Sequence, residues 1–149
     1  MQINWCRDEK YLDQMARFQV QMAWETEKFE LNFETVYRGI ETQIKKSDTG
    51  RYLLATENDH LVGMLLALNE WSDWRCQNVI WIHSVFILPE FRKMKVFRKM
   101  YEMIQAEVNS DDSLAGIRLY VDKSNIPAQK VYQKIGMNDE HYALYEWMK

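Results

Sequence analysis

Residues 79–98 read VIWIHSVFILPEFRKMKVFR, and this stretch decides the fold. Its first ten residues are apolar on both faces, which is typical of a central strand in a sheet. Pro89 ends that strand, because proline cannot donate a ladder hydrogen bond. Apolar residues then recur at three- and four-residue spacing, which predicts a long amphipathic helix. The stripe of that helix consists of Phe97, Met100, Tyr101, Ile104 and Val108.

The flanking sequence places further elements around this strand and helix. Helical patterns are expected at residues 12–23 and 33–44, the second capped by Asn32, and after Asn125, where Gly136 suits a helix end. Strands are expected at residues 3–5, 52–56, 61–68, 117–121 and 142–148. This order predicts an α/β fold of the mixed α+β kind, with a central, mostly antiparallel twisted sheet flanked by helices on both faces. No repeat or linker divides the chain, so residues 1–149 are expected to form one domain.

Composition excludes several classes of protein. The chain has 149 residues, 47% of them hydrophobic and 28% charged, and a formal net charge of −3. A disordered chain would be less apolar, and a nucleic-acid-binding domain would be basic. The longest apolar-rich stretch, residues 62–68, is too short to cross a membrane. The two cysteines, Cys6 and Cys76, form no CxxC pair and no metal-site spacing; two reduced thiols are the simpler interpretation, and a disulfide requires the fold to bring them together. We therefore expect a cytoplasmic protein without metal, nucleic acid or membrane partners.

The junction after Pro89 is rich in positive charge. Five cations lie within eight residues, namely Arg92, Lys93, Lys95, Arg98 and Lys99. They surround the expected N-terminus of a helix, where unpaired amides and the helix dipole favour an anion. One interpretation is a phosphate site, and the other is a solvated basic face.

A second stretch, residues 125–137, places Ala128 and Tyr132 one helical turn apart. A phenol at this position could act as an acid, or it could be a core residue with a satisfied hydroxyl.

Together and in this order, the two stretches resemble the GNAT superfamily of N-acetyltransferases. The family pattern N-x-x-A-x-x-x-Y-x-x-x-G-[FM] is matched at Asn125, Ala128, Tyr132, Gly136 and Met137. The family pattern V-x-P-x-[YF]-[RQ]-x-x-G-x-[GA] is matched at Pro89, Phe91 and Arg92, with Ile87 for the valine. The resemblance covers residues 52–149, and the two N-terminal helices are in the expected place.

The resemblance implies that acetyl-CoA is the co-substrate. Backbone groups of Val85, Phe86 and Ile87 would line the pantetheine arm, and Asn125 and Ala128 would border it from the other side. The pyrophosphate would lie against the loop and helix start formed by Arg92, Lys93, Met94, Lys95, Val96, Phe97 and Arg98.

Two positions depart from the family pattern. Lys95 and Phe97 stand where the family has a glycine and a small residue, which let backbone amides approach a pyrophosphate. A left-handed conformation at Lys95 would cost about 1–2 kcal/mol, although its ammonium could meet a phosphate directly.

The resemblance also implies two catalytic residues. Tyr132 would protonate the departing thiolate, and His83 occupies the position of the family's basic glutamate. A neutral imidazole can accept a proton near neutral pH. The alternative for His83 is a core histidine with a hydrogen-bonded ring.

The leading hypothesis is an N-acetyltransferase that moves an acetyl group from acetyl-CoA to a primary amine of a small molecule by direct attack. Candidate acceptor-binding residues are Glu25, Glu70, Trp71 and Asp73, because carboxylates beside tryptophans suit a cationic amine. The alternative interpretation of these residues is that they form solvated acidic loops whose tryptophans pack inward. The alternative function is a non-catalytic acyl-CoA-binding or protein-interaction module that keeps the fold, which Lys95 and Phe97 favour. The apolar residues 142–148 would be risky as a bare strand at a sheet edge. The resemblance implies pairing through late strands and hence a homodimer; the alternative is that a neighbouring strand or helix of the same chain covers them.

Overall fold

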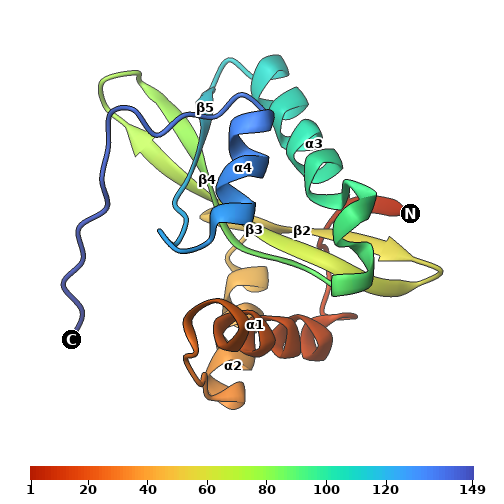
Figure 1. Cartoon of the computed structure of the whole chain (residues 1–149). Coiled ribbons are helices and arrows are strands. Elements are labelled where there is room, and N and C mark those ends of the chain that lie inside the picture. Colours follow the sequence, from red (N-terminus) through yellow and green to blue (C-terminus); the bar gives the residue numbers. More distant parts are fainter. The chain divides into compact units, whose positions relative to one another are not determined.

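The computed structural model describes all 149 residues and divides into two compact units, residues 1–119 and residues 120–149. The first unit contains a five-stranded sheet in the order β1-β2-β3-β4-β5 (Figure 1). Its strands are β1 (Gln2–Trp5), β2 (Gly50–Glu57), β3 (His60–Ser72), β4 (Gln77–Ile87) and β5 (Leu114–Leu119). The first four strands pair antiparallel in sequence order, and β5 pairs parallel to β4. The predicted mixed, mostly antiparallel sheet is thus confirmed.

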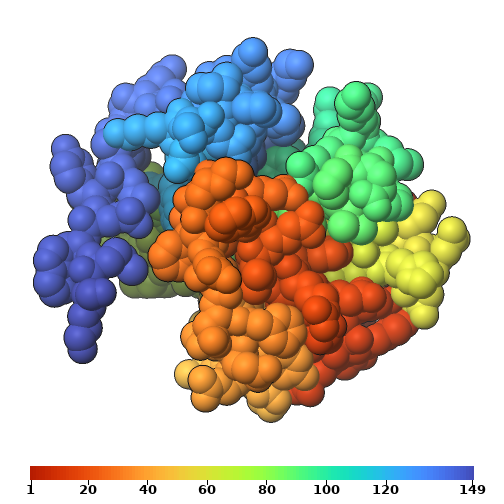
Figure 2. Space-filling view, turned by 60° about the horizontal axis from the view of Figure 1, so that its bottom comes forward, coloured from red at the N-terminus to blue at the C-terminus, as the bar shows by residue number.

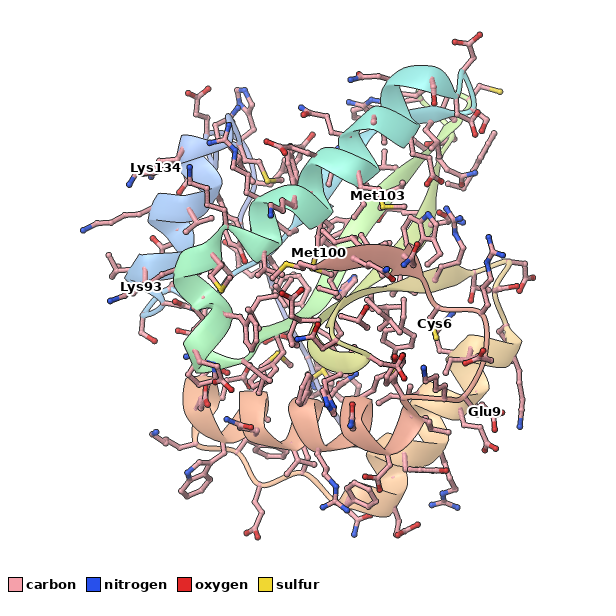
Figure 3. The ribbon with its side chains drawn as sticks, turned by 90° about the vertical axis from the view of Figure 1, so that its right-hand side faces the viewer. Cys6, Glu9, Lys93, Met100, Met103 and Lys134 are labelled. Carbon is pink, nitrogen blue, oxygen red and sulfur yellow. The ribbon has the colours of Figure 1, made fainter.

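Helices cover both faces of this sheet, as predicted. The helices of the first unit are α1 (Leu12–Glu27), α2 (Phe33–Lys45) and α3 (Val96–Ser110), and a 3₁₀ helix, η1 (Pro89–Met94), precedes α3. Figure 3 shows the sheet between α3 on one side and α1 with α2 on the other. Figure 2, turned to bring α1 and α2 forward, shows them covering their side of the first unit. Asn32 caps α2 as predicted, since its side chain accepts a hydrogen bond from the Thr35 amide.

Two layers of core side chains hold these elements together. On the α1 and α2 side, the buried cluster includes Leu12, Met15, Phe18, Ile40, Tyr52, Leu54, Met64 and Phe86. On the α3 side, the buried residues of the helix are Val96, Met100, Tyr101 and Ile104. Met100, labelled in Figure 3, is fully buried. Each such side chain contributes about 1.5–3 kcal/mol through its burial.

Two expected features are wrong. The strand expected at residues 61–68 does not end there but continues through residues 69–72, because pairing of β3 with β4 extends as far as Ser72 opposite Gln77. Residues 142–148 were expected to form a strand but have no regular secondary structure. A strand needs a neighbour for its backbone hydrogen bonds, and the unit of residues 120–149 contains no strand to pair with.

The second unit is built around one helix, α4 (Ile126–Lys134). Its start is capped as predicted, because the Asn125 side chain accepts a hydrogen bond from the Ala128 amide at 3.2 Å. Gly136 follows the helix with φ +90°, a conformation that glycine adopts without strain. None of the helices in the chain has both the length and the apolar character needed to cross a lipid bilayer.

Candidate active site

The central strand β4 is interrupted by a bulge. Leu66 of β3 lies opposite His83, and Met64 lies opposite Phe86, so Leu65 alone faces both Ser84 and Val85. Ser84 has φ +50°, in the left-handed region that serine rarely adopts. A bulge of this kind disrupts the ladder and redirects backbone groups, and bulges are over-represented beside active sites.

Beyond the bulge, β4 loses its neighbour on the other side. The parallel pairing with β5 ends at Ile82 opposite Leu119, so no strand of the first unit flanks residues 83–87 on that side. The side chains of Phe86 and Ile87 are buried, so a ligand can contact these residues only through their backbone amide and carbonyl groups. An elongated molecule with amide groups could therefore pair with this part of β4, as a further strand would.

The strand is followed by a helix start suited to an anion. Lys95 lies between η1 and α3 with φ 58° and ψ 28°, and no side chain caps α3. The first hydrogen bond into α3 runs from the Lys99 amide to the Lys95 carbonyl, so the amides of Val96, Phe97 and Arg98 precede the intrahelical ladder. These amides and the exposed cations around them fit a diphosphate group.

The two residues that depart from the family pattern leave this loop shape in place. Lys95 adopts the left-handed conformation that glycine would adopt, which is the strained alternative expected from the sequence. The Phe97 ring lies 6.3 Å from that of Tyr101, one helical turn further along α3. The fold therefore accommodates both side chains without unwinding the helix start.

The side chain of Arg92 forms hydrogen bonds with two other residues of the chain. Its Nε donates to the Ile87 carbonyl at 2.9 Å, and its Nη2 donates to Glu25 Oε2 at 2.6 Å. The guanidinium also lies 5.7 Å from the centre of the Phe86 ring. Arg92 thus joins the end of β4, η1 and the last turn of α1.

Glu25 is the other half of that link. Burial opposes its ionisation, but hydrogen bonds from Arg92 and Gln21 outweigh this effect and lower its pKa. The carboxylate is therefore ionised at neutral pH and paired with Arg92, rather than presented alone to a cationic acceptor.

His83 lies immediately before the bulge and is half-buried. Burial lowers its pKa below the ordinary value of 6.5, so the imidazole is neutral at neutral pH. The ring is stacked with that of Trp81, with their centres 6.1 Å apart. A neutral imidazole at this position has the protonation state that a general base requires.

The other candidate acceptor-binding residues do not form one cluster. Glu70 pairs with Arg118 across the sheet at 3.3 Å. Trp71 follows Glu70 directly and points to the opposite face of the strand, with 60% of its surface exposed. Asp73 lies in the turn between β3 and β4, where its carboxylate accepts from the Trp74 amide.

Tyr132 lies on α4, one turn after Ala128. Burial raises the pKa of this phenol above 10, so it stays protonated at neutral pH, as a general acid must be.

Sequence reasoning missed two features of this region. The bulge at Ser84 carries no local signal, since serine is not a residue that favours positive φ. Arg118 stands out only through its pairing with Glu70, 48 residues away in the chain.

Comparisons with known proteins agree with this geometry. The model of the acetyltransferase (GNAT) family matches residues 10–137. A structure of a possible acetyltransferase from Clostridium difficile 630 is 32% identical with a TM-score of 0.91, covering 99% of this chain and 97% of that one. No curated protein matches the sequence significantly.

Two more distant structures contain ligands. AAC(6')-Iy in complex with the bisubstrate analogue CoA-S-monomethyl-acetylneamine is 16% identical, with a TM-score of 0.77 over 99% of this chain and 97% of that one. A predicted acetyltransferase with acetyl-CoA from Clostridium acetobutylicum is also 16% identical, with a TM-score of 0.73 over 97% and 96%. At this identity the two structures show a shared fold.

Proposed function

The chain belongs to the acetyltransferase (GNAT) family, whose members are acetyl-CoA-dependent acyltransferases, and we propose that it acetylates a primary amine of a small molecule by direct attack. The observation that carries this proposal is the continuous series formed by the bulge at Ser84, the unflanked end of β4 and the start of α3. Acetyl-CoA supplies the acetyl group and a thiolate leaving group. Its pantetheine amides suit β4 and its phosphates suit the helix start.

Each proposed role uses a group in a suitable protonation state. His83 takes a proton from the acceptor's ammonium, directly or through water, with its neutral ring nitrogen. The neutral amine then forms the new C–N bond at the acetyl carbonyl carbon, and the C–S bond breaks. Backbone amides of Val85 and Phe86 beside the bulge stabilise the oxyanion that develops. The Tyr132 hydroxyl gives its proton to the thiolate.

The non-catalytic alternative rested on Lys95 and Phe97. Because Lys95 keeps the left-handed geometry of a glycine and Phe97 packs along α3, neither substitution removes the anion-binding helix start. The feature of the sequence that favoured the non-catalytic alternative is thereby removed.

A test of the proposal combines an acceptor screen with a conservative variant. Acetyl-CoA and a panel of primary amines are mixed with the protein, and free thiol is measured. Tyr132→Phe should reduce turnover by about 10²-fold or more, with little change in the dissociation constant of acetyl-CoA. Tyr145→Phe, in the exposed stretch after α4, is the matched control and should keep wild-type turnover. Wild-type turnover in Tyr132→Phe would return this residue to a packing role.

A further inference from the structure

A pair of opposite charges lies on the same sheet face as His83. Arg118 of β5 and Glu70 of β3 reach across β4, with 3.3 Å between Nη1 and Oε1. The register places Trp81 of β4 beside Arg118, and Val79 opposite Glu70. The pair therefore links β3 to β5 across the face of β4, which lies between them.

Strand alternation places this pair next to the proposed base. Trp81 and His83 are two residues apart on β4, so their side chains share a face, and their rings are stacked. Because strands lie about 4.8 Å apart and rise about 3.3 Å per residue, the Cα atoms of Arg118 and His83 are about 8 Å apart. Strand β5 thus places the positive charge of Arg118 on the same sheet face as the proposed base.

The ion pair between Arg118 and Glu70 is partly exposed and weak. The side chains of Arg118 and Glu70 are 31% and 47% exposed, and a single contact at 3.3 Å is weak for a guanidinium and a carboxylate. A carboxylate of a ligand can bind a guanidinium through two parallel hydrogen bonds, which is a stronger arrangement.

A glycine lies on the same sheet face as the pair. Gly116 lies two residues before Arg118 on the same face of β5, next to Val79 of β4. A Cβ atom built on Gly116 would meet no atom within 4 Å. No neighbouring atom therefore occupies the position that a side chain at residue 116 would take, two residues before Arg118.

We propose that the acceptor carries a carboxylate as well as its primary amine, and that Arg118 binds this carboxylate while the amine is held near His83. Glu70 positions the guanidinium in the absence of the acceptor. This inference rests on the proposed amine acetylation. It selects amino acids and related aminocarboxylic acids over polyamines, because a second positive charge would be repelled by Arg118.

The test compares acceptors that differ only in the carboxylate. Amino acids are assayed against their own carboxamides, and kcat/KM is expressed per neutral amine to remove the difference in amine pKa. We expect the preferred amino acid to exceed its carboxamide by at least 10-fold, the size of a charge-assisted hydrogen bond. Arg118→Gln should abolish that preference through a higher KM, with kcat and acetyl-CoA binding unchanged.

Two further variants serve as controls. Arg118→Lys keeps the positive charge but loses the two parallel hydrogen bonds of the guanidinium, so it should retain part of the preference for a carboxylate. Glu70→Gln keeps the guanidinium and should maintain or strengthen carboxylate binding. Turnover of amines and carboxamides without any preference for a carboxylate would overturn this inference and leave the acetyltransferase proposal standing. Absence of turnover with every acceptor, together with intact acetyl-CoA binding, would overturn both.

Discussion

Lys95 shows how a single strained residue shapes an anion-binding site. Its left-handed conformation turns the chain from η1 into α3, and the first amides of α3 precede the intrahelical ladder. The usual residue for this geometry is glycine, and a lysine there costs about 1–2 kcal/mol. The ammonium that comes with this cost adds a positive charge where the phosphates of acetyl-CoA are proposed to bind.

Replacing Lys95 by glycine should separate these two effects. Lys95→Gly should stabilise the fold by about 0.5–1 kcal/mol, since relief of strain exceeds the added flexibility of the unfolded chain. It should also weaken acetyl-CoA binding a few-fold through the lost charge. Chemical denaturation and calorimetry measure the two quantities. Lys93→Gly, in η1, is the control and should lose stability; a loss of stability in Lys95→Gly as well would contradict the strain argument.

The titration of His83 gives a second prediction at this scale. Because burial lowers its pKa below 6.5, the base is neutral and active above that pKa, and activity is lost as the pH falls through it. His83→Ala should lower kcat by about 10²–10⁴-fold and remove this acidic limb of the pH profile. His60→Ala, at the exposed first residue of β3, is the matched control. An unchanged rate and profile in His83→Ala would make His83 a packed residue.

Sequence patterns single out Lys95 and His83 as candidate site residues, but they do not reveal the bulge between β3 and β4. The departure at Lys95 is visible because a glycine is expected there, and its strained conformation is confirmed. Ser84 cannot be predicted from its own identity, because the bulge depends on the register of β4 against β3. Register is a property of two paired strands, so it cannot be inferred from the identity of one residue.

At the scale of elements, the pairing of Glu25 with Arg92 joins α1 to the loop before α3. These residues are 67 positions apart, so no local pattern could pair them. The lowered pKa of Glu25 keeps its carboxylate charged, and the ion pair is therefore lost only as the pH falls below the usual value of 4.5. The link holds η1 in place next to the end of β4.

Removing the Glu25–Arg92 ion pair should change the KM for acetyl-CoA more than the KM for the amine acceptor. Glu25→Gln should raise the KM for acetyl-CoA about 3–10-fold, because Arg92 loses its partner and η1 is held less firmly, while stability changes by less than about 1 kcal/mol. Glu27→Gln removes the same charge from the exposed end of α1 and should leave both KM values unchanged. A rise in the acceptor KM alone would instead support the original interpretation of Glu25 as an acceptor-binding residue.

Elements with strong local signals were predicted well. Asn32 and Asn125 cap their helices as expected, and the strand that ends at Pro89 is present. The expected strand at residues 142–148 is absent, because aromatic residues favour a strand only where a neighbouring strand can complete the ladder.

At the scale of the whole molecule, the stretch after α4 is the main exposed apolar segment. Tyr142, Tyr145 and Trp147 are 76%, 93% and 89% exposed. Contiguous exposed apolar residues are typical of an interaction surface, and the proposed partner is a second copy of this chain.

The dimer proposal can be tested by light scattering at micromolar concentration. The wild-type protein should have twice the monomer mass, and the double variant Tyr145→Ser with Trp147→Ser should have the monomer mass. Trp74→Ser, which removes an equally exposed tryptophan from the turn between β3 and β4, should remain dimeric. A monomer mass for the wild type would exclude the dimer.

The most direct test of the proposed activity is the stoichiometry of the complete reaction. Wild-type protein is incubated with acetyl-CoA and a primary amine that supports turnover, and mass spectrometry measures the acetylated amine while a thiol reagent measures CoA. Direct attack predicts one acetylated amine for each CoA released, with no CoA release when the amine is omitted. Release of CoA and acetate without an acetylated amine, or binding of acetyl-CoA without turnover of any amine, would contradict amine acetylation.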